Sequence, residues 1–141
     1  MAKSDQQKLK EKLDEVFSEY IRLRDSDHYG YCSCIICGAR HFWKSGMRGI
    51  NNGHFMSRSL LATRFDEDNC HAQCNGCNGR IDQKLMMRDF EFALVDKIGE
   101  ERIKAIKVRS KETMKVDSLW YQEKIQYYKN KVAEFLQQKQ L

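Results

Sequence analysis

Two Cys-x-x-Cys pairs are the residues in this sequence whose type and spacing most clearly indicate chemistry. Cys34 and Cys37 form the first pair, and Cys74 and Cys77 form the second, with residues 38–73 between them. Each pair can turn two thiolates toward one tetrahedral zinc ion. Matched pairs bind metal more often than they form disulfides in a reducing compartment. The sequence therefore predicts one structural Zn²⁺ held by these four cysteines.

The other two cysteines, Cys32 and Cys70, lie outside this set. Cys32 could exchange with Cys34 as a ligand, but the spacing of Cys34 and Cys37, followed by Gly38, suits a tight zinc knuckle better. We interpret Cys32 and Cys70 as free thiols in packed positions. The alternative for the paired cysteines is that they are buried or redox-active thiols.

A series of histidine and asparagine residues lies between and beside the cysteine pairs. Metal-dependent hydrolysis of a phosphodiester needs a base to activate water and a divalent ion to neutralise developing charge. His54 is the candidate general base, because imidazole titrates near pH 6.5. Asn69 could orient that imidazole by holding a loop against its strand, and Asn78 could offer an amide oxygen to Mg²⁺ or Mn²⁺. His71 could complete the catalytic site.

Each of these residues also has an ordinary structural interpretation. A single histidine is usually a hydrogen-bonded residue of the surface or core, and Asn69 or Asn78 could be a turn or cap residue. The functional hypothesis rests on their occurrence together.

Basic residues surround the candidate site. The chain has 25 Lys and Arg against 20 Asp and Glu, a formal net charge of +5, which suits a polyanionic partner without requiring one. Arg58, Arg64, Arg80 and Lys84 are the candidate DNA-binding residues, because cationic side chains can hold the phosphate backbone without reading bases. The alternative is a solvated charged surface.

Apolar periodicity predicts helices on both sides of an irregular middle segment. Residues 28–69 lack helical periodicity and hold most of the glycines, which indicates short strands, turns and loops, with His54 on a strand. The expected helices cover residues 4–25 with Ser4 and Gln7 as a capping box, 74–98 ending at Gly99, 100–109, and a last helix capped by Asp117 or Ser118.

These elements predict an α+β fold with a zinc-centred treble-clef core and flanking amphipathic helices. We expect one domain over residues 1–141: an N-terminal helix (1–27), a zinc-bound core (28–98) and a C-terminal helical extension (99–141). No apolar run approaches the roughly 18 residues of a transmembrane helix, and the N-terminus is polar. The sequence predicts a cytoplasmic protein that does not bind membranes.

Several ordered motifs resemble the NinG (Rap) family of lambdoid-phage recombination proteins, part of the HNH and endonuclease VII group of treble-clef nucleases. The resemblance covers about residues 20–106. Its landmarks are Ile21-Arg22-Leu23-Arg24-Asp25, Cys34-Ile35-Ile36-Cys37-Gly38, Gly53-His54-Phe55 with Ser57, Arg64-Phe65-Asp66-Glu67-Asp68-Asn69, and Gln73-Cys74-x-x-Cys77-Asn78.

This resemblance implies a DNA endonuclease that cuts branched recombination intermediates such as Holliday junctions and flaps. His54 matches the HNH base, Asn69 the central asparagine and Asn78 the final metal-site residue. Two departures concern the metal site. Many HNH enzymes carry Asp where this chain has Gly53, although NinG-like proteins also have Gly there, and relatives often carry His and Gly-Asn where this chain has Arg80 and Gln83-Lys84.

Two other function classes fit the same residues. A zinc-stabilised DNA-binding protein without catalysis would keep the four cysteines and the basic residues, and a protein-interaction module would not bind DNA. The aromatic residues of the last helix, Trp120, Tyr121, Tyr127 and Tyr128, could pack within one chain or pair two chains in a homodimer suited to a junction.

Overall fold

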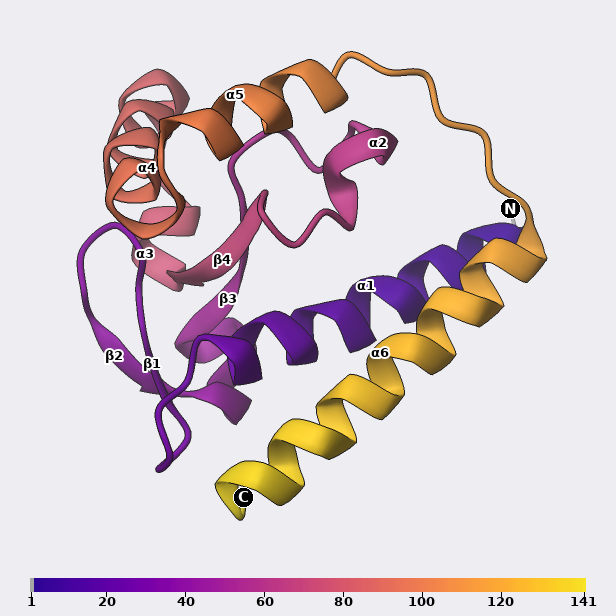
Figure 1. Cartoon of the computed structure of the whole chain (residues 1–141), viewed down its shortest axis with the longest axis horizontal. Helices are drawn as coiled ribbons and strands as arrows, with labels where there is room; N and C mark the ends of the chain where they lie inside the picture. Colours follow the sequence, from indigo (N-terminus) through magenta and orange to yellow (C-terminus); the bar gives the residue numbers. More distant parts are fainter. Residues whose placement is uncertain (1) are drawn as a thin grey trace.

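The computed structural model describes residues 2–141 as a mixed α+β protein. Four short strands and a short helical turn, η1, lie between residues 31 and 74, and helices fill most of the rest (Figure 1). The helices are α1 (Asp5–Arg24), η1 (Trp43–Arg48), α2 (Leu61–Arg64), α3 (Asn75–Asn78), α4 (Gln83–Ile98), α5 (Glu100–Arg109) and α6 (Ser118–Lys139). The strands are β1 (Tyr31–Ser33), β2 (Arg40–Phe42), β3 (Ile50–His54) and β4 (Cys70–Cys74).

Helix α1 begins where the sequence predicts. The Ser4 hydroxyl accepts a hydrogen bond from the Gln7 backbone at 3.2 Å, and the Gln7 side chain accepts one from the Ser4 backbone at 3.0 Å. This reciprocal pair satisfies two of the donors that a helix N-terminus leaves free, which confirms the capping box. One face of α1 is buried, including Leu13, Phe17 and Ile21.

Helix α6 covers that buried face and runs parallel to α1. Gln6 near the start of α1 donates to the Val116 carbonyl, and Lys139 at the end of α6 donates to the Leu23 carbonyl. The segment between α5 and α6 therefore returns to the N-terminal end of α1 (Figure 1). Tyr121 and Tyr128 are buried against α1, so these two aromatic residues pack within the chain.

The strands form two separate antiparallel hairpins. β1 pairs with β2, and β3 pairs with β4 in a register that sets Gly53 opposite His71 and His54 opposite Cys70. Each hairpin has two strands, so one edge of β3 carries no neighbouring strand. Successive side chains of a strand point to opposite faces. His54 and His71 therefore belong to opposite faces of the β3–β4 hairpin.

The expected continuous helix over residues 74–98 is wrong. α3 ends at Asn78 before Gly79, and α4 begins only at Gln83. The Asp82 carboxylate accepts a hydrogen bond from the Leu85 backbone at 3.0 Å and so caps a new helix. The break places Arg80 in a connection between two helices, whereas the predicted helices 100–109 and 118 onward are confirmed.

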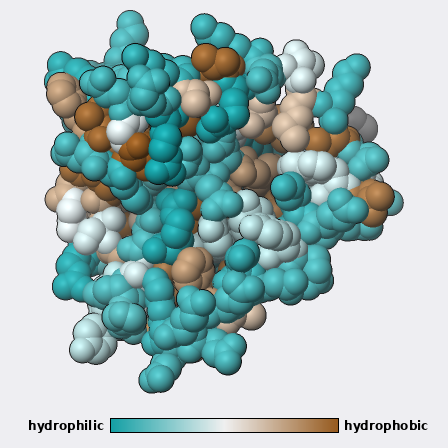
Figure 2. All heavy atoms as spheres, in the orientation of Figure 1, coloured by the Kyte–Doolittle hydropathy of each residue, from teal (hydrophilic) through white to brown (hydrophobic). Residues whose placement is uncertain are grey.

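Two apolar clusters stabilise the chain. The larger one joins α1, α6 and the cysteine-bearing segments, and the smaller one joins Phe55 to Phe90 and Leu94 of α4 and to Ile103 and Ile106 of α5. Much of the surface is hydrophilic in the view of Figure 2, with scattered apolar groups. None of the described helices is long and apolar enough to cross a membrane.

Candidate functional site

The four predicted cysteines come together although they lie on two distant segments. Cys34 and Cys37 flank the turn between β1 and β2, where Gly38 adopts φ +75° and its N–H donates to the Cys34 carbonyl at 2.9 Å. Cys74 ends β4 and caps α3, and Cys77 lies within α3. All four Sγ atoms lie within 4.8 Å of one another. The four predicted residues are therefore placed where they could hold one metal ion.

The cluster has the geometry and the charge requirement of a zinc site. The Cys37 and Cys74 sulfur atoms are 3.6 Å apart, near the separation of about 3.8 Å that tetrahedral Zn–S bonds of about 2.3 Å require. A hydrogen bond from the Ala39 backbone lowers the pKa of Cys37 to about 7, whereas burial and the neighbouring thiols raise the pKa of Cys77. A bound cation would allow all four groups to ionise together.

The remaining cysteines lie apart from this cluster. Cys32 and Cys70 are fully buried, and their thiols donate to the backbone carbonyls of Arg22 and Arg64. Burial raises the pKa of Cys32 to about 11 and also raises that of Cys70. Both are therefore protonated thiols held in packed positions, which is how the sequence was interpreted.

A cavity of about 710 Å³ is lined by residues of β3, α1 and the α3–α4 region. His54, Arg58 and Asn78, three of the predicted site residues, line it together. Its other lining residues are Asp14, Glu15, Ser18, Asn51, Asn52, Phe55, Met56, Ser57, Leu60, Gln83, Met86 and Met87. The fold thus brings a histidine, several amides and a guanidinium to one hollow.

The hydrogen bond of His54 determines which of its ring nitrogens is free. Nε2 lies 2.9 Å from the Arg64 carbonyl oxygen, which can only accept, so Nε2 carries the proton. Nδ1 is then left with a lone pair. Burial lowers the pKa of His54 below its ordinary value, partly offset by the bond to Arg64. The imidazole is therefore neutral near pH 7 and can accept a proton at Nδ1.

Asn69 holds the loop that follows His54. Its side chain is fully buried; Oδ1 accepts from the Met56 backbone at 2.7 Å, and Nδ2 donates to the Met56 and Thr63 carbonyls at 3.1 and 2.9 Å. These bonds connect the end of β3 to the segment that supplies the Arg64 carbonyl. Asn69 does not line the cavity, and its bonds hold the loop that joins His54 to Arg64.

The structure does not bring His71 into the cavity, which corrects the expectation that it completes the catalytic site. His71 lies on the opposite face of the hairpin and is 1% exposed. Its Nε2–H donates to the Asp68 carbonyl at 2.7 Å, and Nδ1 accepts from Arg24 at 3.2 Å. Burial, with the nearby charges of Lys97 and Arg24, lowers its pKa to about 4. His71 is a neutral, fully bonded core residue.

The candidate DNA-binding residues differ in the exposure of their side chains and in whether an acidic side chain already pairs with them. Arg64 binds Asp14 through two nitrogens, and its side chain is 13% exposed, so it is chiefly a structural clamp between α2 and α1. Arg58 also contacts Asp14 but its side chain is 59% exposed at the cavity rim. Arg80 pairs with Asp89 at 2.7 Å, and Lys84 is exposed in the first turn of α4.

Asn51 and Asn52 are cavity residues to which the sequence analysis gave no role. The Nδ2 of Asn51 and the Oδ1 of Asn52 are buried without a hydrogen-bond partner among the described residues. A buried polar atom without a partner is costly unless water or a ligand satisfies it. In the sequence they lie just before Gly53 and His54, which could have marked them as candidate site residues. Only the folded structure shows that both line the cavity.

Comparison with known proteins identifies the family. The family model described as bacteriophage lambda NinG protein matches residues 1–138. The chain belongs to the NinG family. No curated protein and no solved structure matched it.

The Arg24-Asp25 landmark of this NinG-family chain has a clear structural role. Arg24 donates to the carbonyls of Glu67 and Cys70, both at 2.7 Å. The Asp25 carboxylate accepts from the Ala72 backbone at 2.9 Å and pairs with Lys97 of α4 at 3.0 Å. The end of α1 therefore fixes β4, and through β4 the second cysteine pair, in place.

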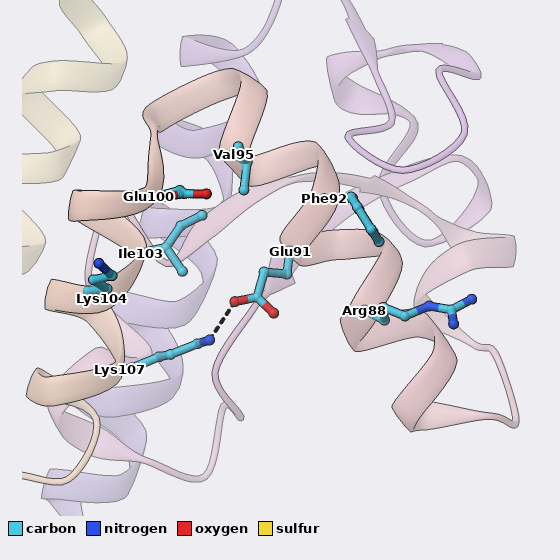
Figure 3. Close-up of a pocket in the computed structure, with 8 residues that line it drawn as sticks. All are labelled: Arg88, Glu91, Phe92, Val95, Glu100, Ile103, Lys104 and Lys107. Atoms are coloured by element: carbon cyan, nitrogen blue, oxygen red, sulfur yellow. Dashed lines mark hydrogen bonds and ion pairs between the residues drawn. The ribbon is translucent and has the colours of Figure 1, made fainter.

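A second hollow, of about 390 Å³, lies between α4 and α5 of the NinG-family chain (Figure 3). Phe92, Val95 and Ile103 give it an apolar wall, and an ion pair joins Lys107 to Glu91 across it. Its lining includes none of the predicted catalytic or zinc-binding residues.

Proposed function

We propose that this NinG-family protein is a metal-dependent DNA endonuclease that acts on branched recombination intermediates such as Holliday junctions and flaps. The observation that carries the proposal is the common cavity of His54 and Asn78, with the Nδ1 of His54 free to accept a proton. We further propose that the β1–β2 turn, the β3–β4 hairpin and α3 form a zinc-centred treble clef of the HNH type.

In this proposal His54 activates the attacking water. Its Nε2–H bond to the Arg64 carbonyl fixes the tautomer and the ring plane, and Nδ1 takes the proton as the water attacks phosphorus. The P–O bond to the leaving sugar oxygen then breaks, and that oxygen takes a proton from solvent water. Asn69 keeps that carbonyl in place through the loop it holds. The amide oxygen of Asn78 can face the ion associated with the phosphate, and the unpartnered Nδ2 of Asn51 can donate to a phosphate oxygen.

The residues at the cavity fit a hard divalent cation. Mg²⁺ and Mn²⁺ prefer oxygen ligands, and Mg²⁺ usually keeps several waters while binding a few protein groups and a substrate phosphate. Asn78 would hold the ion through its amide oxygen. When bound, the ion neutralises the charge that develops on the phosphate oxygens. The Asp14 carboxylate is already neutralised by Arg64 and Arg58, so it is not a free ligand.

Arg58 is the best-placed group for the DNA backbone in this proposal. Its guanidinium is exposed at the cavity that holds His54, whereas Arg80 and Lys84 lie beyond Asn78 and could extend the contact along a strand. Such contacts bind phosphates and so depend on salt concentration. Exposed Leu119 and Tyr127 on α6 leave a surface for a second copy, and a homodimer would present two sites to a junction.

The alternative function is a non-catalytic, zinc-stabilised DNA-binding recombination protein. The two proposals are separated by incubating zinc-loaded protein with labelled four-way junction, flap and linear duplex DNA, with and without Mg²⁺ or Mn²⁺. We expect the wild type to cut branched DNA only with the divalent ion. His54→Ala should bind the same DNA but cut at least about 100-fold more slowly, because the general base is lost.

The matched control is His28→Ala, which removes an exposed histidine outside the cavity and should leave cleavage unchanged. Tight, salt-sensitive binding by the wild type without cleavage under any of these conditions would favour the non-catalytic alternative.

A further inference from the structure

Gly53, which precedes His54, has no room for a side chain. A Cβ built there would lie 2.2 Å from Oε1 and 2.7 Å from Cβ of Gln73. Gly53 is not among the glycines with positive φ, so its backbone conformation does not require glycine. The requirement is steric: the space that a side chain at position 53 would fill is occupied by the carboxamide of Gln73.

Gln73 is a buried amide with few partners. It is 1% exposed, and its Nε2 makes only a 3.6 Å contact with the sulfur of Met86, a weak acceptor. No donor among the described residues reaches Oε1 within hydrogen-bond distance. An amide oxygen that accepts no hydrogen bond can accept one from water or bind a cation.

The neighbours of Gln73 connect it to the proposed active site. It lies opposite Asn51 on β3, whose Nδ2 also lacks a partner, and both Asn51 and Met86 line the cavity that contains His54 and Asn78. Gln73 directly precedes Cys74, and Asn78 directly follows Cys77. Zinc binding by these cysteines would therefore fix the two amides relative to each other.

We propose that Gln73 supplies an oxygen ligand to the catalytic divalent cation, together with Asn78. This inference rests on the proposed endonuclease function. Gln73 reaches across the hairpin into the space that a side chain at position 53 would fill, and Gly53 is required so that it can do so. Two neutral amides attract Mg²⁺ less than carboxylates do, so the ion should bind mainly when a DNA phosphate completes its shell.

The direct test measures Mn²⁺ binding by electron paramagnetic resonance, using zinc-loaded protein with a non-cleavable phosphorothioate junction. Gln73→Leu removes the oxygen with little change in volume and should weaken Mn²⁺ binding at least about tenfold. Gln73→Glu supplies a carboxylate and should tighten it. Gln122→Leu removes an exposed amide of α6, outside the cavity, and should have no effect.

A relocation experiment tests the steric part of the inference. Gly53→Asp alone should lower the melting temperature, because its Cβ would overlap Gln73. Gly53→Asp combined with Gln73→Ala provides the space and should recover the melting temperature and bind Mn²⁺ more tightly than the wild type. Zinc content and thermal unfolding of every variant show whether the fold is retained.

The outcomes separate this inference from the function on which it rests. Mn²⁺ binding that is weakened by Asn78→Ala but unchanged in Gln73→Leu and Gln73→Glu overturns the ligand role of Gln73 and leaves the endonuclease proposal standing. A wild type that binds no Mn²⁺ with the junction present overturns both. Gly53→Asp that is as stable as the wild type overturns the steric argument.

Discussion

At the scale of single residues, two histidines one register apart on the same hairpin have opposite roles. His54 uses one ring nitrogen for the Arg64 carbonyl and keeps the other for the cavity, whereas both nitrogens of His71 are bonded in the core. Strand alternation causes this difference, because adjacent registers face opposite sides of the hairpin. Protonation of His71 should therefore change the stability of the fold, and protonation of His54 should change the cleavage rate.

His71 should make the protein less stable in acid. Its pKa is about 4 in the folded chain and about 6.5 when unfolded, so the unfolded state binds more protons between these values. The stability is complete above about pH 6.5 and falls by roughly 3 kcal/mol as the pH drops to 4. His71→Gln can still donate to Asp68 but does not titrate, so urea unfolding should show a shallower loss.

The comparison must be made between variants, because acid also protonates the zinc ligands in each of them. His28→Gln changes an exposed histidine and should follow the wild type. Equal pH dependence of unfolding in wild type and His71→Gln would contradict the assigned burial effect.

His54 should give the cleavage rate an acid limb that lies lower than for an ordinary histidine. The base must be neutral, and burial lowers its pKa below the usual value. Single-turnover cleavage should therefore keep more than half of its plateau rate at about pH 6.5, where an unperturbed imidazole would be about half protonated, and should fall at lower pH. A rate already halved at pH 6.5 would contradict this prediction.

At the scale of elements, the short connection between α3 and α4 decides the shape of the cavity wall. Asn78 ends one helix and Gln83 begins the next, and both line the cavity. A continuous helix would have carried residues 79–82 in regular turns, whereas Gly79 and the Asp82 cap let the chain change direction. Capping of α4 should therefore influence both stability and the site.

Asp82→Ala should lower the free energy of unfolding by about 1 kcal/mol, because the Leu85 N–H loses its acceptor. Asp82→Asn keeps a side-chain oxygen at the cap and should recover most of this loss. Chemical denaturation followed by circular dichroism measures both. If Asn and Ala at position 82 destabilise equally, the charge of Asp82 rather than its capping bond stabilises α4.

At the scale of the whole molecule, the four-cysteine cluster and α1 both contact the hairpin that carries His54, and α6 packs on α1. The larger apolar cluster includes Cys34, Cys74 and Cys77 as well as residues of both long helices, so the candidate zinc site and the helix packing belong to one core. Loss of the ion would leave thiols whose pKa values burial raises, as for Cys74 and Cys77, in that core. We therefore expect the whole fold to lose stability together when zinc is removed.

One equivalent of zinc should co-purify with the wild type and be lost in Cys37→Ser. Removing it with a strong chelator should abolish the cooperative thermal transition, because structural zinc contributes its binding energy to folding. Mass spectrometry of the metal and scanning calorimetry measure both effects. Cys32→Ala removes a buried thiol outside the cluster and should keep the zinc. An unchanged transition after complete zinc removal would contradict this dependence.

The sequence alone determined the features whose physical cause lies within a few neighbouring residues or in the order and spacing of motifs along the chain. Cysteine spacing predicted the four-cysteine cluster, and the Ser4 box and Asp117 cap set the starts of two helices because capping bonds join residues three apart. The ordered motifs placed the chain in the NinG family, as the family comparison shows.

Only the tertiary structure decided which polar residues share the cavity. Strand register and hairpin faces separate His71 from His54, and the bond to Asp14 uses the guanidinium of Arg64. The contact of Gln73 with the space beside Gly53 crosses two strands that are 20 residues apart in sequence (53 to 73). No local pattern records such contacts, because they arise only when distant segments are folded together.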